Sequence, residues 1–134
     1  TGGVPDYLPG IPDGEITLLN TKADRFAVFV RRVANQVFGA LRRQNWQRMP
    51  SGEVFRISDF STVHAVLSAD GKLLRVTIEK QSGSQTFDAI LRSAAQSGSW
   101  DQNPPPGAVG EDGNIHFIFR SRVWSRPPGP NGIG

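Results

Sequence analysis

Residues 62–80 read TVHAVLSADGKLLRVTIEK, and this stretch decides the fold. Both ends of the stretch are rich in β-branched and aliphatic residues, which favour extended backbone. Between them lies Ala69–Lys72, whose Asp-Gly step is typical of a tight turn between antiparallel strands. The sequence therefore predicts a β-hairpin with strands at 62–68 and 73–80.

The second strand of this hairpin alternates in character along its length. Leu74, Val76 and Ile78 point one way, whereas the residues between them are polar: Arg75, Thr77 and Glu79. Alternation of this kind is typical of an antiparallel sheet with one buried and one wet face. We therefore expect a layer of helices on one side of the sheet.

An amphipathic helix is predicted upstream of the hairpin. Apolar residues recur there at steps of three and four, at Phe26, Val30, Val33, Val37 and Leu41. Asn20-Thr21 is placed to cap the helix, with Asp24 in a capping-box position. The helix should fray near Arg43 to Trp46, because a residue before a proline disfavours helical backbone and Met49-Pro50 follows. Ser51-Gly52 then predicts a turn.

A second helix is predicted after the hairpin, from about Thr86 to Gln96. It carries Phe87, Ile90, Leu91 and Ala94 on one face, and Gly98 should end it. Ser82-Gly83-Ser84 precedes it, where a nucleophile elbow could lie, but the Gly-x-Ser-x-Gly pattern is absent. A turn followed by a helix cap is the preferred interpretation.

The last predicted strand runs from Ile115 to Trp124. Ile115, Phe117 and Phe119 share one face, and the other face carries His116, Ile118, Arg120 and Arg122. A proline-rich loop over 100–113 separates this strand from the second helix. A right-handed crossover would place the last strand beside the first strand of the hairpin and make it an edge strand.

Together these elements predict an α+β fold of two layers, with a three-stranded antiparallel sheet and two helices on one face. Residues 1–14, rich in proline and glycine, are expected to be the end of a flexible linker. The folded domain should span 15–126, and 127–134 should form a disordered tail.

Composition narrows the function classes. The chain has 134 residues, a formal net charge of +3 and a sequence pI near 10.0, but its arginines are dispersed rather than gathered in one block, so a nucleic-acid partner is not predicted. The absence of cysteine excludes disulfides, thiolate metal sites and a cysteine nucleophile. No apolar run is long enough to span a bilayer, which leaves a membrane anchor upstream as an alternative.

Residues that could carry chemistry are few. His64 and His116 lie in different predicted strands with no helical ligand pair beside them, so the sequence predicts no metal site. No acid and base pair is recognisable, and we expect neither a catalytic residue nor a cofactor. An arginine face on the first helix could meet phosphates or anionic lipid head groups, or remain solvated, and it consists of Arg25, Arg31, Arg32, Arg42 and Arg43.

The order of these signals resembles the TonB C-terminal domain family. In that family a hairpin with a glycine turn is followed by a Ser-Gly step, an Asp-containing helix, a proline-rich loop and a closing strand. The matching segments here are Asp70–Leu73, Val76–Gly83, Phe87–Leu91 with Ala94-Ala95, Asn103–Pro106 and Asn114–Phe119. The resemblance covers Thr62 to Trp124. The TolA C-terminal domain looks similar in arrangement, and the tyrosine-proline step frequent before the first TonB strand is missing.

The resemblance implies a periplasmic energy transducer rather than an enzyme. Its parent would be a single-pass inner-membrane protein, driven by a proton-powered motor of the ExbB/ExbD kind through an anchor upstream. Its partner would be a TonB-box peptide of an outer-membrane transporter, which adds a strand to the sheet edge. The residues expected to bind it are those of the closing strand: Ile115, His116, Phe117, Ile118, Phe119, Arg120, Ser121 and Arg122.

Two alternatives stay open at this point. A TolA-like or motility-machine adaptor would keep the fold and take a different envelope protein as its partner. The edge of the closing strand could also be covered, either by the amino-terminal segment or by a second copy of the chain in a homodimer.

Overall fold

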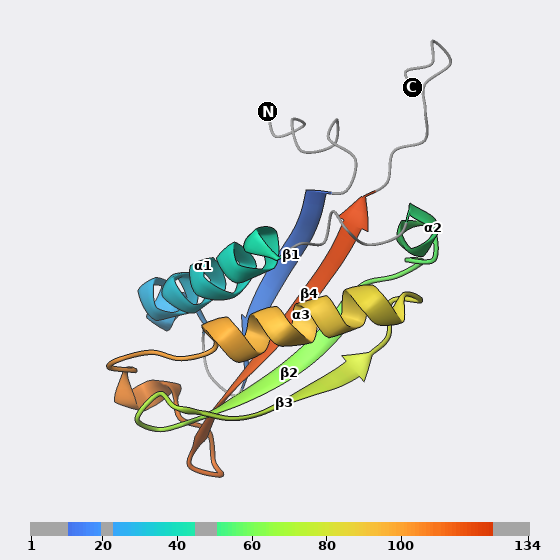
Figure 1. Ribbon diagram of the computed structural model, residues 1–134. Helices are drawn as coiled ribbons and strands as arrows, with labels where there is room; N and C mark the ends of the chain where they lie inside the picture. The colour runs from blue at the N-terminus through green and yellow to red at the C-terminus, as the bar shows by residue number, and fades with distance from the viewer. Residues whose placement is uncertain (1–10, 20–22, 45–50, 125–134) are drawn as a thin grey trace.

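The computed structural model describes residues 11–19, 23–44 and 51–124 (Figure 1). Short 3-10 turns lie at Ala23–Phe26 and Pro106–Ala108. The helices and strands follow in the order β1 (Ile11–Leu18), α1 (Ala27–Arg43), α2 (Ser51–Val54), β2 (Ser61–Ser68), β3 (Leu73–Lys80), α3 (Gln85–Gly98) and β4 (Asn114–Trp124). None of the helices in these ranges combines the length and the apolar character needed to cross a membrane.

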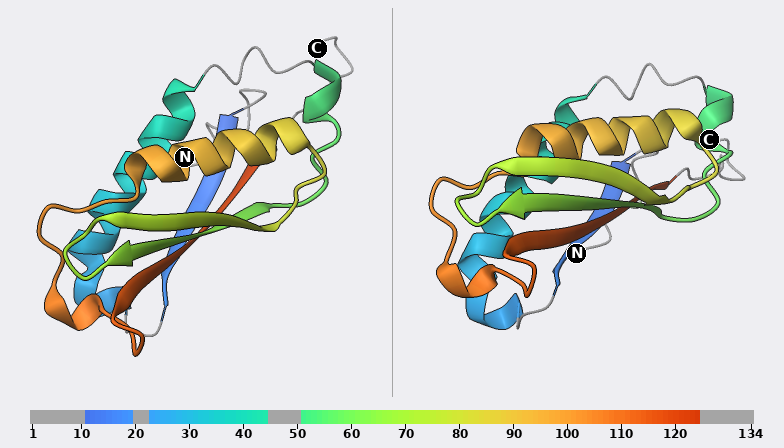
Figure 2. Two further views of the ribbon diagram at one scale, coloured as in Figure 1. Left: turned by 60° about the horizontal axis from the view of Figure 1, so that its bottom comes forward. Right: turned by 90° about the horizontal axis from the view of Figure 1, so that it is seen from below.

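The strands form one antiparallel sheet in the order β1-β4-β2-β3. Helices α1 and α3 cover one face of this sheet, and no helix of the described residues lies on its other face (Figure 2). The two-layer α+β architecture agrees with the sequence, but the expected number of three strands is wrong, because the described residues alone form a sheet of four.

The additional strand is β1. Its first residue is Ile11, so the predicted domain boundary at residue 15 falls inside a strand and residues 11–14 belong to the sheet. Pro12 and Gly14 are residue types that disfavour strands, which is why the segment resembles a linker in isolation. The remaining linker residues, 1–10, and the predicted tail lie outside the described residues.

The hairpin forms as expected, with a turn at Gly71, whose φ is +90°. Its second strand departs from the predicted alternation at one position. Leu74 is 51% exposed, because the register shifts between the β2 residues Val66 and Leu67 and leaves Leu74 without a direct partner on β2. Such a β-bulge turns a side chain away from its expected face.

Helix α3 lies close to its predicted position, but α1 begins later than expected. Helix α1 runs from Ala27 to Arg43, after a 3-10 turn, and its N-cap is Phe26 with no side-chain hydrogen bond. The expected capping of this helix from Asn20-Thr21 and Asp24 is therefore wrong, and Asn20 and Thr21 themselves lie outside the described residues. The expected turn at Ser51-Gly52 is wrong, because these residues open the short helix α2.

Helix α3 is capped as the sequence suggests. The Ser84 hydroxyl accepts a hydrogen bond from the Phe87 N–H at 3.1 Å, and the buried Asp88 carboxylate accepts one from the Ser82 N–H at 3.0 Å. The Ser82–Ser84 segment is therefore a helix cap.

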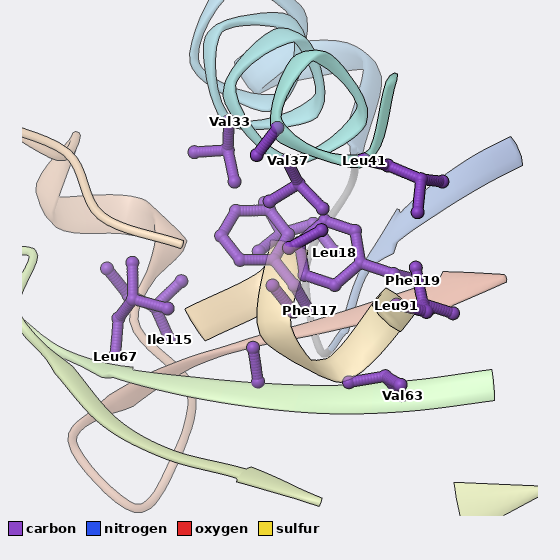
Figure 3. Close-up of a cluster of buried hydrophobic side chains, with 14 of the residues drawn as sticks. Leu18, Val33, Val37, Leu41, Val63, Leu67, Leu91, Ile115, Phe117 and Phe119 are labelled. Carbon is purple, nitrogen blue, oxygen red and sulfur yellow. The ribbon is translucent and has the colours of Figure 1, made fainter. Parts of the chain in front are cut away.

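The core lies between the helices and the sheet (Figure 3). Ile115, Phe117 and Phe119 of β4 are fully buried at its centre, as the alternation of the last strand predicts. Leu18 of β1 is also buried, with only 3% of its surface exposed. Strand β1 is therefore tied to the core at its carboxyl end.

Candidate functional site

The predicted binding strand, β4, lies inside the sheet. It pairs with β1 on one side, from Ile11↔Trp124 to Leu18↔Phe117, and with β2 on the other, from Ser61↔Ser121 to Ser68↔Asn114. The expectation that β4 is an edge strand is therefore wrong: the amino-terminal segment covers its edge. Whether residues 115–122 bind a partner stays a prediction.

The backbone groups of β4 alternate between its two neighbours. The Leu19 N–H donates to the His116 carbonyl at 2.9 Å, which fixes the phase of the ladder. Because hydrogen-bonding positions alternate along an antiparallel strand, the odd-numbered residues of β1 face the even-numbered residues of β4. The main-chain groups that face β1 are the N–H and C=O groups of His116, Ile118, Arg120 and Arg122. We call them the acceptor row, because together they can receive a neighbouring strand; the name covers hydrogen-bond donors as well as acceptors. In this structure β1 occupies it.

Side chains hold β1 unevenly along its length. Leu18 is buried and Ile16 is partly buried against the core. On the open face of the sheet, the Glu15 carboxylate pairs with the Arg120 guanidinium, which also lies 4.4 Å from the centre of the Phe60 ring. Gly14 differs, because a Cβ there would come within 2.3 Å of the Phe38 ring, so a larger residue fits only if that ring shifts.

Each of the two edge strands of the described sheet carries a feature that interrupts main-chain pairing at its outer edge or in its ladder. In β1, Pro12 lies at an even-numbered position, which faces away from β4, and a proline there removes an N–H from the outer edge. In β3, the register shifts leave Leu74 and Glu79 without direct partners, so regular pairing with β2 is limited to Arg75–Ile78. Both features are typical of edges that resist the addition of another strand.

The open face brings together two histidines that the sequence placed apart. His64 Nε2 and His116 Nδ1 lie 2.9 Å apart, and His116 Nε2 lies 2.7 Å from Asp112 Oδ2. His64 Nδ1 is 3.6 Å from Glu79 Oε2. Since Asp112 accepts from His116 Nε2–H, Nδ1 of a neutral His116 accepts from His64. The four side chains thus form a row that begins in the turn before β4 and crosses β4, β2 and β3. The register between β2 and β4 brings the two histidines together. Val66 pairs directly with His116, and His64 lies two residues away on the same face of β2.

This row makes stability depend on pH through Asp112. The pKa of Asp112 lies below its ordinary value of 3.8. The larger cause is the hydrogen bond from the Asn114 N–H, and the next is the hydrogen bond from His116. A lowered folded-state pKa stabilises the fold above 3.8, and the contribution is lost as the pH falls through the folded value. We therefore expect Asp112→Ala to lower the urea midpoint at pH 6 and to lose this effect at pH 2, as followed by circular dichroism.

The matched control is Glu111→Ala, which removes the same charge from the neighbouring residue. Glu111 is exposed, so this substitution should change the urea midpoint little at pH 6. An Asp112→Ala defect of equal size at both pH values would show that the carboxylate contributes no charge-dependent stability.

The arginine face of α1 is partly neutralised. Arg32 donates to the Asp101 carboxylate from Nε and from Nη2, each at 3.0 Å, and the hydrogen bond raises the pKa of Arg32. This pair ties α1 to the loop that follows α3. A recess of about 480 Å³ lies beside it, between the start of α1 and Pro104–Pro106. In the described part of the chain, no group of three or more histidine or acidic side chains is placed to hold a metal ion.

Comparison with known proteins gives one structural likeness. No family model matches the chain, and no curated protein does either. The solution structure of a TonB C-terminal domain from Helicobacter pylori, residues 179–285, superposes with a TM-score of 0.52 at 12% identity, over 83% of this chain and 89% of that one. At this identity the likeness concerns the fold alone, and the fold is TonB C-terminal-domain-like.

Proposed function

We propose that this chain is the periplasmic, protein-binding domain of a TonB-like energy transducer. It takes an extended peptide from an outer-membrane transporter as an additional strand of its sheet. A motor of the ExbB/ExbD kind in the inner membrane would pull on it through an anchor upstream of these residues. No catalytic step and no cofactor enter this proposal.

The observation that carries the proposal is the fold. The chain has a sheet with helices on one face, in a TonB C-terminal-domain-like arrangement. Its resemblance to the TonB family implies that a partner peptide adds a strand to this sheet. Main-chain pairing suits a pulling module, because many aligned hydrogen bonds share the load and tolerate varied peptide sequences.

A titration tests the proposal directly. We expect a synthetic TonB-box peptide of an outer-membrane transporter to shift the amide resonances of the isotope-labelled chain along β4 and β1. The matched control is the same peptide with a central residue replaced by proline, which removes an N–H that a strand must donate and should weaken binding about tenfold or more.

Two results would contradict the proposal. Shifts confined to the arginine face of α1 would indicate an anionic ligand instead of a strand. A lack of shifts with transporter peptides, together with binding to a peptide from a Tol-system or motility protein, would assign the same fold to a different envelope adaptor.

A further inference from the structure

Strand addition requires a long, regular row of unpaired main-chain groups, so its site in this sheet can be sought from the register. The outer edge of β3 offers four regularly paired residues between two bulges. The outer edge of β1 lacks the N–H of Pro12. Neither edge suits a long extended peptide.

Strand β4 has the regularity that the edges lack. It is 11 residues long, and its ladders with β1 and with β2 each run over eight pairs with no shift in register. Its acceptor row is turned toward β1, and its other main-chain groups face β2. Displacement of β1 would therefore expose a continuous row, whereas displacement of β2 would break the hairpin and the core.

Strand β1 can leave the sheet without breaking the β2–β3 hairpin. It lies at the end of the sheet, and its only fully buried described side chain is Leu18. At its amino end, Gly14 contributes no side chain and Pro12 is a poor strand residue. Resting on the proposed function of strand addition, we propose that β1 occupies the partner's place in cis, and that the partner strand displaces it and pairs with the acceptor row of β4.

The register indicates what chemistry the incoming strand needs. A carboxylate opposite Arg120 would replace Glu15, and apolar side chains opposite Phe119 and Phe117 would replace Ile16 and Leu18. A residue without a side chain suits the position opposite Ser121, where the Phe38 ring fills the space. The partner is thus an extended segment in which glycine and a carboxylate precede two apolar residues at alternate positions.

A reversible lock between β1 and β4 tests this displacement. Thr17 and Ile118 are directly paired, so their Cα atoms are about 5.5 Å apart, within the range of a disulfide. Because the chain has no other cysteine, Thr17→Cys/Ile118→Cys gives one defined bridge. The probe is a fluorescent peptide of residues 11–19, IPDGEITLL. It is added at millimolar concentration, because it must compete with the chain's own β1, whose effective concentration as a tethered segment is about millimolar.

We expect the reduced double variant to bind the probe and the oxidised one to bind it at least tenfold more weakly. The control bridge, His64→Cys/Thr77→Cys, joins the paired residues of β2 and β3 and should leave binding unchanged in either redox state. A second variant acts in the opposite direction. In Gly14→Val, the new side chain clashes with the Phe38 ring and weakens the pairing of β1, so probe binding should become several-fold stronger. Thr17→Val, at an exposed position of the same strand, should not strengthen it.

Each contrary outcome is distinct. Equal binding to the oxidised and reduced forms would place the incoming strand on an outer edge and overturn the displacement. No binding of the probe to the reduced form would also overturn it, even if a transporter peptide binds elsewhere. Conversely, probe exchange with no response to any transporter peptide would retain the displacement and reject the proposed function.

Discussion

Replacing Phe117 with alanine should destabilise the domain by about 3–5 kcal/mol. Phe117 is fully buried on β4, and its ring centre lies 5.5 Å from that of Phe29 and 5.9 Å from that of Phe119. Truncation removes apolar surface from the core and leaves a cavity between helix α1 and the sheet. Because domains of this size are stable by only about 5–15 kcal/mol, this variant should lose a large share of its stability at 25 °C.

Urea denaturation followed by circular dichroism measures this effect. The matched control is Phe55→Ala, since Phe55 is 71% exposed and its truncation should change the free energy of unfolding by about 0.5 kcal/mol or less. A Phe117→Ala loss as small as that of the control would mean that the aromatic cluster in Figure 3 does not form the core.

Gly98→Val should be comparably damaging, with an expected cost above about 3 kcal/mol. Gly98 is the last residue of α3, and a Cβ there would lie 2.6 Å from the carbonyl carbon of Gln36 and from the nitrogen of Val37 in α1. Main-chain atoms cannot rotate away, so the two helices must separate. The Gln36 side chain donates to the Gly98 and Trp100 carbonyls, each at 2.8 Å, and the first of these hydrogen bonds would be lost as well.

The matched control for this substitution is Gly52→Ala. A Cβ at Gly52 meets no atom within 4 Å, so alanine should be neutral or stabilise α2 slightly. Thermal unfolding of both variants measures the difference. A Gly98→Val domain that melts with the parent chain would show that the two helices do not approach closely at this residue.

The local pattern was sufficient for most elements. The hairpin, the apolar stripe of α1 and the inward face of β4 follow from periodicities of two and 3.6 that any sheet or helix imposes. The resemblance to the TonB family, drawn from Thr62 to Trp124, agrees with the TonB C-terminal-domain-like fold of the chain. Position-specific features such as the bulge at Leu74 could not be predicted in this way, because they depend on the partner strand.

The candidate site was predicted less well than the fold. Residues 115–122 were correctly assigned to a strand, but that strand was expected at an edge, and it lies between β1 and β2. The row formed by Asp112, His116, His64 and Glu79 was not expected either. It requires the lateral register of three strands, which no single segment specifies.

The sequence by itself determined the hairpin, helices α1 and α3 and strand β4, and which of their faces are apolar, because those preferences depend on neighbouring residues. Only the tertiary structure decided the order of the strands. Strand β1 contains Pro12 and Gly14 and has little preference for a strand alone; it becomes one because β4 offers hydrogen-bonding groups and the core accepts Leu18. The pairing of β1 with β4, which is distant in sequence, thus outweighs the weak strand propensity of β1 itself. It places β1 on the acceptor row, where we propose that a partner binds.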